Sequence, residues 1–221
     1  VGHSTTGTLD DANDNTGVGI GALDAITSGD RNTAVGNDAG TALTTGLANT
    51  LIGMSAGVAV TTSHNNTAVG TYSLMTQSTS SGAGSNVAVG ASALQNAAAA
   101  ASNTALGKDA GLAISSGDYN ICIGYDGGDN ITTGSGNIII GTGDAAAVDS
   151  ARTFKVISYD GSSTTNHIIS DSSGNMTLAA DLTIGDDLLL DSDSCVLKFG
   201  DDQDVTLTHT DGTGLTLNST S

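Results

Sequence analysis

The chain has 221 residues and a formal net charge of −18, and it contains 31 glycines, no proline and no tryptophan. An aromatic content of 3% excludes a core built on large rings, and the scarcity of strong helix formers excludes a helical protein. With only five basic residues, the chain is not expected to bind nucleic acid. No stretch approaches the roughly 18 apolar residues of a transmembrane helix, so membrane insertion is not expected either.

Residues 1–14 precede a repeat that occupies residues 15–150, and we interpret them as an N-terminal lead-in. Each copy of the repeat begins with asparagine, and its fourth and fifth residues are an aliphatic residue and glycine. Eight copies follow one another at intervals of 17 residues, with one interval of 20, and their asparagines are Asn15, Asn32, Asn49, Asn66, Asn86, Asn103, Asn120 and Asn137. A fixed period of this length predicts stacked repeats.

Two aliphatic positions in each copy predict how the chain winds. The third residue after each asparagine, such as Val35, is interpreted as an inward side chain before a glycine turn. Eight residues further on, a second aliphatic recurs, with Gln77 and Ala97 as the exceptions. We therefore predict two short strands in each copy and an all-β fold: a β-solenoid, or β-roll, of 17-residue coils.

The eight asparagines are expected to stack as a ladder along this solenoid. Their side-chain amides would bond to the copies above and below, and asparagine tolerates the left-handed conformation that a corner can require. They are candidate structural residues.

The second residue after each asparagine carries a hypothesis about assembly. Alternation along a strand would point it outward if the third residue points inward, yet it is never polar. A small, apolar outward face is best explained by burial against identical chains, and a trimer is the usual solution for such fibres. The alternative is a monomeric solenoid with a stripe of alanines on its surface. The predicted inter-chain face consists of Ala34, Leu51, Ala68, Ala88, Ala105, Cys122 and Ile139.

The 20-residue interval contains an insertion, which in repeat proteins maps to a surface loop. Its residues could contact a ligand, or the insertion could be a tolerated bulge. The candidate contact residues are Gln77, Ser80, Ser81 and Ser85.

Residues 151–221 lose the period and show short alternating strands between Asp, Gly and Ser clusters. We interpret this part as a β-rich fibre shaft shared among chains. The predicted strands are 153–158, 167–170, 176–179, 182–184, 196–199, 205–208 and 215–217.

Several motifs resemble catalytic or ligand sites, but the repeat accounts for them better. The stretch Gly53–Gly57 matches a nucleophile elbow but lies in phase with the other copies, and Gly141–Ala146 matches a dinucleotide fingerprint without a following helix. We therefore predict no enzyme and no cofactor, with calcium at turn aspartates as the alternative. Cys122 and Cys195 are interpreted as small packing residues, and the four histidines lack metal-ligand spacing.

The units Asn32–Gly40 and Asn103–Gly111 resemble the head repeats of trimeric autotransporter adhesins, and similar repeats occur in bacteriophage tail fibres. That resemblance spans about residues 15–148 and implies a trimeric β-roll. Residues 197–217 also resemble stretches of structural proteins of marine phages.

The resemblances imply a structural protein of a phage tail, located in the virion, that supports or performs host attachment. Its implied partners are identical chains, other tail proteins and a host surface receptor, with polysaccharide as one receptor class. The alternatives are a bacterial surface adhesin head and a self-polymerising extracellular filament; a tailspike hydrolase is a further, enzymatic alternative.

Overall fold

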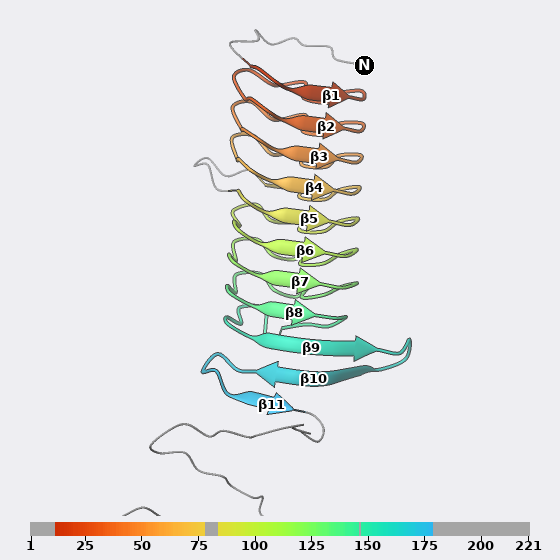
Figure 1. Cartoon of the computed structure of the whole chain (residues 1–221), viewed down its shortest axis with the longest axis vertical. Helices are drawn as coiled ribbons and strands as arrows, with labels where there is room; N and C mark the ends of the chain where they lie inside the picture. Colours follow the sequence, from red (N-terminus) through yellow and green to blue (C-terminus); the bar gives the residue numbers. More distant parts are fainter. Residues whose placement is uncertain (1–11, 78–83, 146, 179–221) are drawn as a thin grey trace, which may run out of the picture. The chain divides into compact units, whose positions relative to one another are not determined.

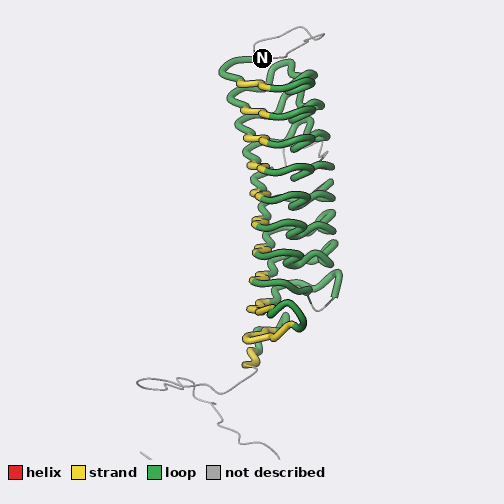
Figure 2. Tube along the Cα trace, turned by 90° about the vertical axis from the view of Figure 1, so that its right-hand side faces the viewer, coloured by secondary structure: helices red, strands yellow, loops and turns green. Residues whose placement is uncertain are grey.

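The computed structural model describes residues 12–77, 84–145 and 147–178. Contacts within the chain divide it into two units, residues 1–181 and 182–221, and the second lies outside the described residues. The described residues form one sheet of eleven strands in sequential order, and they contain no helix (Figures 1 and 2).

Each of the eight copies contributes one three-residue strand that begins directly after its asparagine. Neighbouring strands pair in parallel and in register, so that Thr33 lies beside Thr50 and Ala34 beside Leu51. The strands are β1 (Thr16–Val18), β2 (Thr33–Val35), β3 (Thr50–Ile52), β4 (Thr67–Val69), β5 (Val87–Val89), β6 (Thr104–Leu106), β7 (Ile121–Ile123) and β8 (Ile138–Ile140). The predicted β-solenoid of 17-residue coils is therefore confirmed.

The prediction of two strands in each copy is wrong. The second aliphatic position lies in a segment of turns and bends, although its side chains are buried in the first seven coils, as Leu43 and Ile114 show. This segment still bonds to the next coil, for example from the Ala42 amide to the Val58 carbonyl at 3.2 Å. Inward apolar spacing alone therefore did not distinguish a strand from an extended series of turns.

A column of glycines follows the strands and sets how closely the coils stack. Gly70 and Gly90 have φ values of 138° and 133°, which side-chain-bearing residues rarely adopt. A Cβ atom on Gly70 would lie 2.4 Å from the carbonyl oxygen of Gly90 in the next coil. The same geometry recurs along the stack, at Gly19, Gly36, Gly53, Gly107, Gly124 and Gly141.

Beyond the eighth coil the sheet continues through two antiparallel hairpins (Figure 1). Strand β9 (Phe154–Tyr159) pairs in parallel with β8 and antiparallel with β10 (Thr164–Ser170), which pairs antiparallel with β11 (Met176–Leu178). These strands agree with the predictions for 153–158, 167–170 and 176–179, and the remaining predicted strands lie outside the described residues.

The core lies inside the coils, and it contains the residues predicted to form an inter-chain face. Those side chains have no exposed surface within the single chain: Ala34, Leu51, Ala68, Ala88, Ala105, Cys122 and Ile139 are all 0% exposed. The predicted direction was reversed, because the second residue after each asparagine points inward and the third points outward. Because these residues are buried within a single chain, their apolar character is not evidence for an oligomer.

The core is narrow, and most coils fill it with one large and one small residue from opposite sides. Leu51 faces Gly57, where a Cβ atom would lie 2.7 Å from Leu51 Cδ2. Where both residues are small, as at Ala34 and Gly40, leucines from the adjacent coils approach instead: a Cβ on Gly40 would meet Leu51 Cδ1 at 2.8 Å. The volume is thus shared between neighbouring coils.

A swap of large and small residues across this core should be tolerated better than either change alone. Leu51→Ala should cost about 3 kcal/mol through the cavity it leaves, and Gly57→Leu should overpack against Leu51. Leu74 and Leu94 occupy the position equivalent to Gly57, both with φ of 49°, so leucine can adopt this backbone.

We therefore expect the double variant Leu51→Ala/Gly57→Leu to recover at least about 1.5 kcal/mol relative to the sum of the single changes. Denaturant unfolding of the four proteins followed by circular dichroism measures this coupling. Additive losses would contradict the pairing.

Candidate functional site

The predicted asparagine ladder is present. In the buried part of the stack, the side-chain oxygen of each asparagine accepts two hydrogen bonds from the asparagine of the next coil. Asn32 Oδ1, for example, accepts from the Asn49 backbone N at 2.9 Å and from Asn49 Nδ2 at 3.0 Å. Asn49 Nδ2 also donates to the Ser63 carbonyl of its own coil at 2.9 Å.

The ladder extends from Asn15 to Asn137 and then to the backbone N of Thr153, which donates to Asn137 Oδ1 at 3.0 Å. The 20-residue coil does not interrupt it, since Asn86 Nδ2 donates to Asn66 Oδ1 at 3.4 Å. From Asn32 onward these side chains are at most 1% exposed, so the ladder is an internal spine.

The asparagines do not themselves adopt the left-handed conformation that was expected at the corner. The residue directly before each asparagine adopts it instead. In coils one to seven its φ lies between 55° and 59°, and these residues are Asp14, Arg31, Ala48, Asn65, Ser85, Ser102 and Tyr119. The asparagine instead lies directly before the strand, where its backbone N donates to the ladder asparagine of the preceding coil.

The outward surface of the sheet consists of two columns of side chains. The outer aliphatic column contains the third residue after each asparagine, and these side chains are partly exposed or exposed, with Leu106 at 48%. Its members in the coils are Val18, Val35, Ile52, Val69, Val89, Leu106, Ile123 and Ile140. The second outer column contains the residue directly after each asparagine, namely Thr16, Thr33, Thr50, Thr67, Val87, Thr104, Ile121 and Ile138. Sequence reasoning missed this surface.

The register carries the outer aliphatic column past the coils into the hairpins. Ile140 pairs with Val156, Val156 with Ile168, and Ile168 with Leu178. Paired residues on neighbouring strands lie on the same face of a sheet. All eleven strands therefore present an aliphatic side chain at this column.

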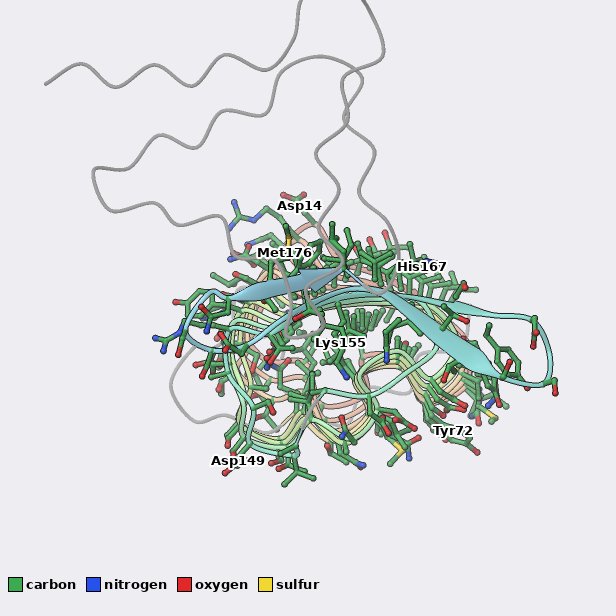
Figure 3. The ribbon with its side chains drawn as sticks, turned by 90° about the horizontal axis from the view of Figure 1, so that it is seen from below. Asp14, Tyr72, Asp149, Lys155, His167 and Met176 are labelled. Carbon is green, nitrogen blue, oxygen red and sulfur yellow. The ribbon has the colours of Figure 1, made fainter. Side chains whose placement is uncertain are left out.

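On the opposite face, Lys155 pairs with Ile139 of the inward column. Figure 3 shows Lys155 on the coil side of the sheet and Met176 on the far side. Lys155 Nζ donates to the Asp144 carbonyl at 2.7 Å, so its amino group reaches the last coil at the end of the core.

The candidate contact loop is mostly outside the described residues, which include neither Ser80 nor Ser81. Ser85 is exposed, but Gln77 is fully buried, with Nε2 donating to the Ala100 carbonyl at 3.1 Å. The interpretation of Gln77 as a contact residue is therefore wrong: it occupies the second inward position of its coil.

Aspartates gather at the corner of the seventh and eighth coils. Burial raises the pKa of Asp129 to about 7, helped by a hydrogen bond with Asp144 and by the charges of Asp144, Asp126 and Asp109. The folded state thus retains a proton that the unfolded state releases near pH 4.

Stability should therefore fall as pH rises from about 4 to about 7 and then level off. Because this carboxyl is only partly buried, solvent screens its interactions and the effect should be on the order of 1 kcal/mol. Thermal unfolding of the wild type and of Asp129→Asn between pH 4 and 8 measures it. Asp129→Asn should flatten this part of the profile, and an unchanged slope would contradict the assignment.

The motif-like residues occupy ordinary positions of the coil. Ser55 lies in a turn with φ of 55°, and its backbone N donates to the Asn37 carbonyl at 2.8 Å. His64 Nδ1 accepts from the Leu47 backbone N at 2.9 Å. Cys122 is a free thiol in the core, where burial raises its pKa to about 12.

The described residues contain no cluster of three or more His, Cys, Asp or Glu side chains placed to hold a metal ion. They also contain no helix long and apolar enough to cross a membrane. Comparisons with protein-family models, curated proteins and solved structures give no match.

Proposed function

We propose that the chain is a structural shaft protein of a phage tail fibre, located in the virion, which holds or forms a host-recognition surface. The observation that supports this most is the continuous stack, in which eight coils share one asparagine ladder, one glycine column and one core. Eight coils at about 4.8 Å each extend about 40 Å.

Stacking of this kind supports a mechanical role. Each coil contacts its neighbours through backbone hydrogen bonds, ladder bonds and shared core volume, so bending or separating the coils breaks several interactions together. A stiff shaft can hold weak receptor contacts at a fixed spacing, and several identical shafts then act with avidity. Other tail proteins and a host receptor, with polysaccharide as one class, are the proposed partners.

Two further roles use the same physics. A bacterial surface adhesin would carry the same stack on a cell, and a self-polymerising filament would join chains end to end. One observation supports the filament role: Gly17, Leu23 and Ile26 of the first coil line a hollow. The resemblance of residues 15–148 and 197–217 to phage fibre proteins favours the phage fibre over both.

Immunogold labelling separates these roles. Antibodies raised against residues 12–178 should label virion tails in lysates of cells that carry the gene. Label on the bacterial envelope in the absence of virions would replace the proposal with the adhesin role. Open-ended filaments of the purified chain, with no label on either, would replace it with the filament role.

A further inference from the structure

We propose that the outward face of the sheet is a self-association surface, on which a second copy of this chain packs in parallel and in register. The surface consists of the outer aliphatic column and the second outer column. The inference deepens the proposed fibre role, on which it rests, by naming the partner and the surface.

The first support is the unbroken apolar character of the face. The outer aliphatic column has no polar residue in any of the eleven strands, and Val18, Ile52, Leu106 and Ile140 are 37–48% exposed. A soluble protein rarely leaves a continuous apolar strip of this length in water. The inward column fills the core, and these outer side chains do not belong to it.

The second support is the charge distribution. The chain has a formal net charge of −18, so two copies repel one another over most approaches. Neither outer column contains a charged residue in the eight coils. This face is thus an apolar part of the solenoid on which identical acidic chains can meet without placing carboxylates in contact.

The third support is the axial period. The column presents one aliphatic group at every strand, about 4.8 Å apart. A globular partner does not present apolar groups at this spacing, whereas a second copy of the chain does, because its strands have the same spacing. Eleven strands give a strip about 50 Å long and about 12 Å wide, or about 600 Å² for each partner, which lies at the lower end of specific interfaces.

The orientation follows from the second outer column. Its first four residues are all threonine, whereas Ile121, Ile138 and then Phe154 make its later part more apolar. Parallel packing places the apolar parts against each other, and it also sets hairpin against hairpin at β9–β11. Antiparallel packing would place isoleucine against threonine.

The hairpin strands need such a partner more than the coils do. Residues on both faces of β10 are exposed or only partly buried, from Thr164 to Ser170. Strands β10 and β11 continue the eleven-stranded sheet beyond the core, which ends at Ile157, and a sheet gains little stability from a face that is not packed. Packing against a second copy would cover Val156, Ile168 and Leu178 as the continuation of the same strip.

Native mass spectrometry and sedimentation of the full chain test the proposal, with the double variant Val35→Lys/Leu106→Lys on the outer aliphatic column. The matched control is Thr45→Lys/Ser116→Lys, which adds the same charge at exposed corners of the same coils. The wild type and the control should have the mass of two or more chains. The column variant should be a single chain at concentrations where the wild type is fully assembled, with an unchanged circular dichroism spectrum.

A cross-link tests the register. Leu106→Cys should form a disulfide between identical positions of two chains under mild oxidation, whereas Thr45→Cys should not. A monomeric wild type, or a column variant that stays assembled, would overturn the proposal. Neither result bears on the immunogold labelling, so failure of this surface is distinguishable from failure of the fibre role.

Discussion

Gly90→Ala is expected to separate the stack between the fifth and sixth coils. Its Cβ atom would lie 2.3 Å from the carbonyl oxygen of Gly107, and the backbone φ of 133° is itself unfavourable for alanine. The neighbour is backbone that is fixed by its own hydrogen bonds, so the clash cannot be relieved by a rotamer change. We expect a loss of more than about 4 kcal/mol.

Amide hydrogen exchange is the suitable measurement, because a stack of repeats need not unfold in one step. Protection should fall most at the amides of Gly90 and Gly107, which donate to the Val69 and Val89 carbonyls at 2.8 Å. Gly161→Ala is the matched control. It has φ of 94° but no atom within 4 Å of the added Cβ, so it isolates backbone strain at about 1 kcal/mol. Equal effects at both sites would show that the stacking contact is unimportant.

Asn49→Asp is expected to have the next largest effect, because it keeps the shape of the ladder side chain and removes its donors. The Nδ2 group donates to Asn32 Oδ1 at 3.0 Å and to the Ser63 carbonyl at 2.9 Å. A carboxylate would face these two acceptors in a site with no exposed surface. We expect a loss of at least about 3 kcal/mol at pH 7.

The loss should be smaller at acid pH, and the sign follows from linkage. Burial without donors raises the folded-state pKa of the introduced aspartate above its unfolded value near 4. The deficit therefore grows as pH rises from about 4 towards that folded pKa. Denaturant unfolding at pH 4 and pH 7 measures it.

Asn37→Asp supplies the control for this change. Asn37 is exposed, and its Nδ2 donates to the Ile20 carbonyl at 3.3 Å, so the same substitution should change stability by less than about 0.5 kcal/mol. A ladder variant as stable as this control would mean that the ladder contributes little to folding.

The sequence by itself determined the coil length, the asparagine ladder and the sequential stack, because all three are consequences of period. An asparagine that recurs every 17 residues occupies the same place in every coil, so its side-chain amide can hydrogen-bond to the equivalent asparagine of the next coil. The strands of the first hairpins were also predictable from their alternation, as the agreement at β9 and β11 shows.

Only the tertiary structure decided which side of the strand faces the core. Ala34 and Val35 are both apolar, so alternation gives two faces but not their direction. Across the strand the flat coil has room only for two small residues or for one large residue opposite a small one, and this places Ala34 inside and Val35 outside. Thr33 is the sequence signal for the correct direction, since it is polar and shares a face with Val35. A large aliphatic side chain normally indicates a core position, but here the narrow interior of the coil admits the smaller residue of the pair.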